Sequence, residues 1–147
     1  MKLSTKGRYG TRLLLDIALH EGEEPVALKD VARRQSIPLA YLKQLVALLV
    51  GRGVLRSTRG VGGGVALAKY PREIKLKEVI DLLEGSTPLV ECISNPQACE
   101  RSGFCVTRDV WNELETATNK ILEATTIEDL VERQKKKQPA NGDMYNI

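Results

Sequence analysis

The sequence predicts a mainly α-helical fold with one small β-hairpin, and three observations support this prediction. Apolar residues recur at helical spacing over most of the 147 positions. Four glycines crowd into residues 59–67, between a basic residue and a short apolar run. Glycine lets a chain turn sharply and lie close to another surface. Three short helical patterns directly precede this glycine-rich stretch, and one long helical pattern follows it.

The first 50 residues are predicted to form three helices. The first spans residues 5–20, where apolar side chains recur every three or four positions, and Pro25 lies beyond its end. A second helix covers residues 28–35. A third runs over about residues 39–50, after the turn at residues 36–38, because proline is favoured where a helix begins. Helix, tight turn and helix form the unit whose second helix enters the major groove of DNA.

The third helix has an apolar and a polar face. Its inward residues are predicted to be Leu42, Leu45, Val46 and Leu49. Its outward residues are Ala40, Tyr41, Lys43, Gln44 and Ala47. Lys43 and Gln44 can donate hydrogen bonds to base edges.

Residues 53–59 and 65–67 flank the glycines and are predicted to form the two strands of the hairpin. Taken alone, the stretch also suits a flexible loop. It does not match the dinucleotide-binding pattern, because no acidic residue follows at the required distance. The helix-turn-helix pattern directly upstream favours the hairpin. Together they are the layout of a winged helix-turn-helix DNA-binding domain, predicted over residues 1–85.

The second half is predicted to hold a helix over residues 74–83 and a long helix over about residues 107–124. The apolar stripe of the long helix contains Val110, Leu114, Ala117, Ile121 and Leu122, with Trp111 beside it. We expect this helix to pack against its copy in a homodimer through Trp111, Leu114 and Ile121. The alternative is that it folds back on its own core.

The segments after the long helix are predicted from local signals. Residues 125–128 resemble a capping box that opens a short helix ending at Arg133. The dimerisation unit would therefore span residues 107–133. Residues 134–147 would form a mobile C-terminal tail.

Charge divides the chain into two halves. Residues 1–72 carry 13 Lys or Arg against 5 Asp or Glu, whereas residues 73–147 carry 9 against 14. This asymmetry suggests a polyanion-binding head and a separate body, although a solvated basic face is the alternative from charge alone.

The composition argues against two classes of protein. No run of 18 apolar residues occurs, and the N-terminus lacks the apolar region of a signal peptide, so we expect a cytoplasmic protein with no membrane partner. His20 is the single histidine, and no nucleophile–base or carboxylate pair is recognisable. The sequence therefore argues against an enzyme.

All three cysteines, Cys92, Cys99 and Cys105, fall within the segment of residues 86–106, of which residues 89–105 are predicted to form an irregular loop. Their odd number and the expected compartment argue against a disulfide framework. Thiolates at such positions can bind a soft metal or an iron–sulfur cluster. Zinc is the competitor, although its paired ligands are usually two to four residues apart, and unrelated thiols are the remaining alternative.

The chain resembles the Rrf2 family of bacterial winged-helix transcriptional regulators over nearly its full length. The resemblance rests on residues 1–10 (MKLSTKGRYG), 41–45 (YLKQL) and 59–64 (RGVGGG) and on the three cysteines. It implies a homodimer that binds an imperfect DNA palindrome and places Arg59 in the minor groove. In cluster-sensing members of the family, cysteines at these places carry a 2Fe-2S or 4Fe-4S cluster.

The predicted DNA contacts come from the N-terminus, the third helix and the hairpin. They are Lys2, Ser4, Lys6, Arg8, Tyr9, Leu39, Ala40, Tyr41, Lys43, Gln44, Arg56, Arg59, Gly60, Gly62 and Gly63.

The chain departs from the cluster-sensing pattern at the fourth ligand. The IscR-type regulators carry a histidine where Arg108 stands, and the nitric-oxide sensors carry an aspartate where Arg8 stands. The nearby carboxylates Glu91, Glu100 and Asp109 and an exogenous ligand are the open candidates. We expect a labile cluster that aerobic purification would remove. The IscR-type regulators also carry glutamate where Lys43 stands, so base preference should differ.

The C-terminus resembles the CymR-type branch, whose members bind cysteine synthase. Residues 144–147 (MYNI) end in an apolar side chain and a free carboxylate, which Tyr145 and Ile147 would dock in a pocket of that enzyme. The alternative is a disordered C-terminus that binds no partner. The sequence thus predicts a repressor that senses iron–sulfur or redox status through its cysteines, or else a cysteine-metabolism repressor regulated by cysteine synthase without a cluster.

Overall fold

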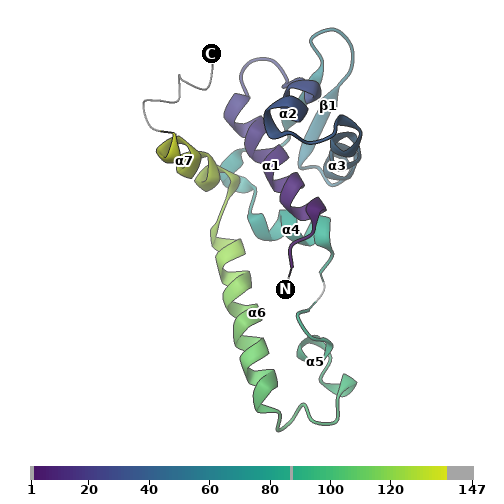
Figure 1. Cartoon of the computed structure of the whole chain (residues 1–147), viewed down its shortest axis with the longest axis vertical. Coiled ribbons are helices and arrows are strands. Elements are labelled where there is room, and N and C mark those ends of the chain that lie inside the picture. The colour runs from purple at the N-terminus through teal and green to yellow at the C-terminus, as the bar shows by residue number, and fades with distance from the viewer. Residues whose placement is uncertain (1, 87, 139–147) are drawn as a thin grey trace.

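A computed structural model describes residues 2–86 and 88–138 of the chain (Figure 1). It confirms a mainly helical fold with one antiparallel hairpin. The N-terminal elements, in chain order, are α1 (Thr5–His20), α2 (Leu28–Gln35), α3 (Leu39–Gly51), β1 (Leu55–Thr58) and β2 (Gly64–Leu67). The later elements are the short 3-10 helix η1 (Pro71–Glu73), α4 (Leu76–Glu84), α5 (Glu91–Ser94), the 3-10 helix η2 (Pro96–Ala98), α6 (Val106–Ala124) and α7 (Ile127–Lys137).

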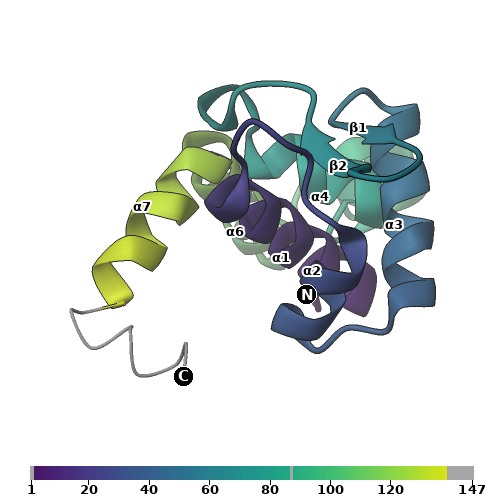
Figure 2. The ribbon, with the colours of Figure 1, turned by 90° about the horizontal axis from the view of Figure 1, so that it is seen from above.

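The first four helices and the hairpin form a head, from which α6 projects (Figure 1). Seen from above, α3 and α7 lie on opposite sides of α1 (Figure 2). Because α7 returns to the head, the chain after α6 is not a free arm. In the part of the chain that the structure describes, no helix is both long and apolar enough to cross a bilayer.

The core of the head is built from one face of each helix. Leu13, Leu14 and Ile17 of α1 are fully buried, because they recur on one side of the helix. The four inward residues predicted for α3 are all buried, which confirms the face assigned to this helix. Burying such apolar side chains contributes about 1.5–3 kcal/mol each.

The hairpin adds its inner strand to this core. Strand β1 pairs with β2 in the register Leu55↔Leu67 to Thr58↔Gly64. Val65, Ala66 and Leu67 are buried, whereas β1 exposes all but its first residue. The hairpin is therefore held to the core through β2, whereas most of β1 is exposed to solvent.

Three predictions about the second half are corrected. The cysteine segment is not an irregular loop throughout, because it contains α5 and η2, the latter begun by Pro96. The last helix does not end at Arg133 but continues to Lys137, so the mobile tail cannot begin at residue 134. Its three C-terminal lysines lie where cations complement the helix dipole. Residues 139–147, including the predicted contacts Tyr145 and Ile147, lie outside the described residues.

The capping box lies one residue later than predicted. Thr126 is the N-cap: its hydroxyl accepts from the Asp129 N–H at 3.1 Å, and the Asp129 carboxylate accepts from the Thr126 N–H at 2.9 Å. The bond from the Thr126 N–H, followed by the Thr126 side chain, stabilises the carboxylate, so the pKa of Asp129 is lowered. Thr125 is unavailable because its hydroxyl donates to the Ile121 carbonyl of α6. Ile127, now the first helical residue, is fully buried in the core.

Candidate DNA-binding surface and cysteine segment

The exposed face of α3 is set by a tight turn after α2. Ser36 adopts the left-handed conformation (φ 54°), and its N–H donates to the carbonyls of Ala32 and Arg33 near the end of α2. Ile37 is buried and Pro38 is the N-cap of α3. This turn leaves Lys43 and Gln44 exposed. Both can therefore reach a groove of DNA with their donors.

Tyr41 is half-buried rather than fully outward. Its ring packs edge-on against the ring of Tyr9, with centroids 5.8 Å apart and planes at 89°. The guanidinium of Arg12 lies 5.4 Å from the Tyr9 ring centre, within the range of a cation–π contact. This aromatic pair joins α1 to the start of α3.

The tip of the hairpin is a narrow turn that glycine permits. Gly60 and Gly62 have positive φ values of 93° and 77°, which side chains other than glycine rarely tolerate. The Gly63 N–H donates to the Gly60 carbonyl at 2.9 Å and closes the turn. Arg59 is exposed at its start, and Arg56 is exposed on β1.

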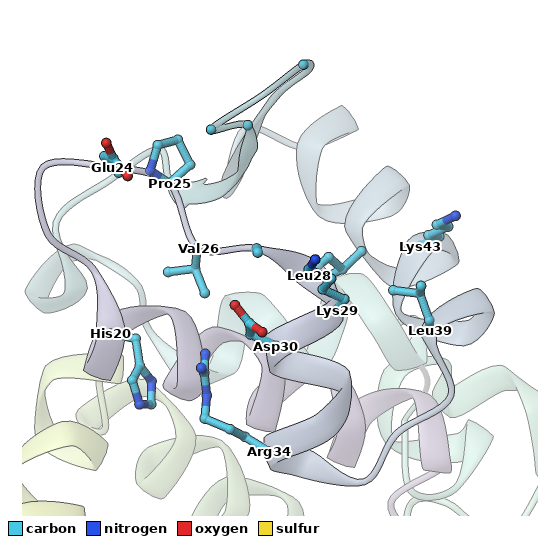
Figure 3. A pocket seen from close by; sticks show the side chains of 14 residues that line it. His20, Glu24, Pro25, Val26, Leu28, Lys29, Asp30, Arg34, Leu39 and Lys43 are labelled. Atoms are coloured by element: carbon cyan, nitrogen blue, oxygen red, sulfur yellow. The ribbon is translucent and has the colours of Figure 1, made fainter.

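An open hollow of about 710 Å³ lies between this tip and the helix-turn-helix unit (Figure 3). Leu39 and Lys43 of α3 border it on one side, and Gly60, Gly62 and Gly63 border it on the other. The structure therefore brings the predicted contacts of α3 and of the hairpin to one concave surface.

The beginning of α1 lies on the other side of α3. Lys2, Lys6 and Arg8 are exposed. Lys6 lines a second hollow, of about 430 Å³, together with Tyr41 and Gln44. Helix α3 thus has the hairpin on one side and the basic start of α1 on the other.

A buried carboxylate that sequence reasoning missed fixes α2 against α1. Asp16 is 1% exposed. Arg34 donates to it through Nε and Nη2 at 2.7–3.2 Å, and Gln35 donates through Nε2 at 2.9 Å. The hydrogen bond to Asp16 raises the pKa of Arg34. The available signal was an acidic residue inside the apolar stripe of α1, between Leu14 and Ile17.

The three cysteines lie in different local settings. Cys92 is half-buried in α5, Cys99 is exposed after η2, and Cys105 is the N-cap of α6. The Cys105 sulfur lies 3.1 Å from the Thr107 hydroxyl. This hydrogen bond, followed by the backbone N–H of Arg108, lowers the pKa of the Cys105 thiol.

The structure does not gather these thiols into a metal centre. Among residues 2–86 and 88–138, no group of three His, Cys, Asp or Glu side chains is placed to hold a metal ion. None of Glu91, Glu100 and Asp109 therefore completes a ligand set in this arrangement. The donor atoms suit a soft metal, but their positions here do not form a cluster site.

Arg108 instead attaches the cysteine segment to α6. Its Nε donates to the backbone carbonyl of Cys92 at 3.1 Å. A guanidinium stays protonated and has no lone pair for a metal, so Arg108 cannot replace a histidine ligand. The Leu89 N–H donates to Glu115 at 3.2 Å and forms a second attachment.

Helix α6 carries an uncovered apolar face. Val106, Val110 and Ile121 are 74%, 54% and 65% exposed, and Trp111 is 40% exposed. Leu114, in contrast, is half-buried and lines a cleft against α4. Of the three predicted dimer residues, Trp111 and Ile121 are thus exposed, whereas Leu114 is partly buried within its own chain.

Residues 3–133 match the family model Rrf2, described as "Iron-dependent Transcriptional regulator". The chain is 42% identical over 131 residues to Protein rrf2 of Nitratidesulfovibrio vulgaris, covering 89% of this chain and 87% of that one. It is 38% identical over 134 residues to the HTH-type transcriptional regulator IscR of Photorhabdus laumondii, covering 91% and 81%.

Two solved structures share the architecture. IscR of T. potens matches with a TM-score of 0.78 and 38% identity, covering 99% of this chain and 96% of that one. CymR, the global cysteine regulator of B. subtilis, matches with a TM-score of 0.78 and 34% identity, covering 90% and 98%. The hairpin beside α3 and the extent of these matches lead to one conclusion: the chain belongs to the Rrf2 family of winged-helix transcriptional regulators.

Proposed function

We propose that this protein is a homodimeric repressor that binds palindromic DNA and senses iron–sulfur or redox status through its three cysteines. The observation that carries the DNA-binding part is the single surface on which α3 lies between the hairpin and the basic start of α1. A regulator of this kind acts where the chromosome is, in the cytoplasm. The family description and the IscR relatives name transcriptional regulators, which supports a role in binding rather than in catalysis.

Each part of this surface has a distinct task in the proposal. Exposed Lys43 and Gln44 read base edges in the major groove. The narrow hairpin tip carries Arg59 into the adjacent minor groove, where negative potential attracts arginine. Lys2, Lys6 and Arg56 contact phosphates, which contribute affinity but carry no sequence information.

Replacing Arg59 with alanine is expected to weaken specific DNA binding by about 1–3 kcal/mol, the range for a side chain that reads base edges. Gly60 and Gly62 keep the tip geometry, so the effect should not come from misfolding. Fluorescence anisotropy with a duplex selected by the protein from random sequence measures it. Arg133→Ala is the matched control, because it removes the same charge from a position on α7, on the far side of α1 from α3 (Figure 2). Equal affinities of the two variants would contradict the minor-groove role.

The homodimer is supported by the uncovered apolar face of α6. A row of exposed apolar side chains along a projecting helix indicates that this face packs against another protein surface. A second copy suits this row, since two heads are needed to engage both halves of a palindrome.

The sensory part rests on the chemistry of the cysteine segment and on its place directly before α6; the three thiols would have to come together from the arrangement described above to bind a cluster. Its three thiols are exposed or half-buried, and it leads directly into α6. Three thiolates are a donor set that iron–sulfur clusters use. The family description and the IscR relatives agree with iron-linked regulation.

Anaerobic purification tests this part. We expect a coloured protein that contains iron and acid-labile sulfide, and a colourless, iron-poor protein when Cys92, Cys99 or Cys105 is replaced by alanine. Ser94→Ala is the matched control, since it also removes one heavy atom from the same segment and its hydroxyl bonds only within α5. A colourless wild-type protein after anaerobic reconstitution, with zinc or with no metal, would contradict cluster sensing.

A cysteine-metabolism repressor is the second candidate, favoured by the likeness to CymR of B. subtilis. In that case the same anaerobic preparation would be colourless and the thiols would hold no cluster. Cysteine synthase would then be the proposed partner, bound through Tyr145 and Ile147.

A further inference from the structure

One carboxylate fixes the start of α1 to the end of α4. Ser4 donates to the same oxygen of Glu84, Oε1, from its backbone N–H at 2.8 Å and from its hydroxyl at 2.7 Å. The two residues are 80 positions apart in the chain. The Ser4 hydroxyl also accepts from the Gly7 N–H at 3.1 Å and so caps α1. A single serine therefore begins the helix and ties it to a distant element.

Two glycines of α1 allow this close approach. A Cβ atom added at Gly7 would lie 2.2 Å from Oε1 of Glu84. A Cβ atom added at Gly10 would lie 2.2 Å from Cδ1 of Leu83. Both distances are far below van der Waals contact, so a larger residue at either position would displace the end of the Glu84 or the Leu83 side chain. Gly7 thus leaves the room in which the Glu84 carboxylate reaches Ser4.

The basic arm consists of residues 2–4 and the first turn of α1, residues 5–8, and this contact ties it to α4 at Ser4. Lys2 and Lys6 are exposed on either side of Ser4. Lys6 lines the hollow that it shares with Tyr41 and Gln44 of α3. The Glu84 carboxylate also lies at the N-terminus of α1, where a negative charge complements the helix dipole.

The other side of the contact leads to the cysteine segment. Glu84 is the last residue of α4, and Gly85 follows as its C-cap with a φ of 84°. The chain then turns away toward α5, beside α6 (Figure 1). Glu84 therefore lies where the DNA-binding head meets the segment that carries the thiols.

We propose that Glu84 is a positioning residue for DNA binding: it holds the basic arm beside α3 and makes the arm's place depend on the end of α4. This inference rests on the proposed DNA-binding function. Glu84 need not touch DNA, because it acts through Ser4. A shift of the α4 end would move the arm away from the phosphates that it binds.

Glu84→Ala and Glu84→Gln test the proposal in the full-length protein, with the duplex that the wild-type protein selects. We expect Glu84→Ala to lower affinity at 0.1 M salt by roughly tenfold for each phosphate that the arm no longer reaches, and to reduce the slope of log K against log salt by about 1 per phosphate. Glu84→Gln keeps a carbonyl acceptor for Ser4, so its affinity and its salt slope should lie closer to those of the wild-type protein than to those of Glu84→Ala. Glu78→Gln is the matched control, because it makes the same change on α4 at a partly exposed carboxylate that pairs with Lys69.

A double-mutant cycle separates positioning from stability. Lys6→Ala should weaken binding in the wild-type background but cost little more in Glu84→Ala, because the arm is already displaced. A merely structural role would lower the melting temperature and leave the effect of Lys6→Ala intact. Glu84→Asp, which keeps the charge but shortens the side chain that reaches Ser4, serves if Glu84→Ala does not fold. Additive effects, or a wild-type salt slope in a folded Glu84→Ala protein, would overturn the inference. Failure of the wild-type protein to select any duplex would instead overturn the proposed function.

Discussion

Replacing Asp16 with asparagine is expected to lower the free energy of unfolding by about 3 kcal/mol. Breaking a buried ion pair typically costs about 3–5 kcal/mol, because the remaining charge is left without its partner. Arg34 is still 25% exposed and regains some hydration, so the lower end applies. An amide also offers one acceptor oxygen where the carboxylate offers two. Urea denaturation followed by circular dichroism measures the change.

Asp30→Asn is the matched control for this prediction. Asp30 also pairs with an arginine of α2, Arg33 at 3.6 Å, but the two side chains are 42% and 73% exposed. Exposed pairs contribute about 0–1 kcal/mol, so this variant should remain close to the wild-type protein. A loss of stability in Asp16→Asn as small as that in Asp30→Asn would mean that Asp16 contributes no more than an exposed charge. The folded fraction of Asp16→Asn should also bind DNA less well, since α2 supports the turn into α3.

Replacing Ile121 with glutamate is expected to separate the proposed homodimer and to abolish the binding to palindromic DNA that we propose for it. Ile121 is 65% exposed in the single chain, so a charge there leaves the fold of each subunit intact. Within a dimer interface the same charge would be buried without a partner, which is strongly unfavourable. A single head would lack the affinity that comes from engaging two half-sites together. Light scattering and an electrophoretic shift with palindromic and half-site duplexes measure both effects.

Asn112→Glu is the control, because it introduces the same side chain at another exposed position of α6. Position 112 lies away from the row formed by Val106, Val110 and Ile121, by helical geometry. Leu114 is the less suitable test, since it lines the cleft with α4 and a charge there would also disturb the subunit. A dimeric Ile121→Glu protein would place the interface on another surface.

The sequence by itself determined the local architecture of the head. Periodicity assigned α1, α2 and α3 almost to the residue, and the glycine cluster together with the helix-turn-helix pattern upstream of it indicated the hairpin. It also identified the buried face of α3, because side chains that point inward on an amphipathic helix are set by the 3.6-residue repeat. Its motifs for residues 1–10, 41–45 and 59–64 identified the family, which the matches to Rrf2 proteins confirm.

Only the tertiary structure decided the features that depend on distant partners. The capping residue of α7 is Thr126 and not Thr125 as the sequence predicted, because Ile127 is buried in the core as the first residue of the helix. The roles of Asp16 and Glu84 became visible only when α2 and α4 were placed against α1. The position of Arg108 beside the Cys92 carbonyl likewise follows from packing. A local pattern encodes which face of an element is apolar, but polar contacts between elements depend on positions that only the packed chain defines.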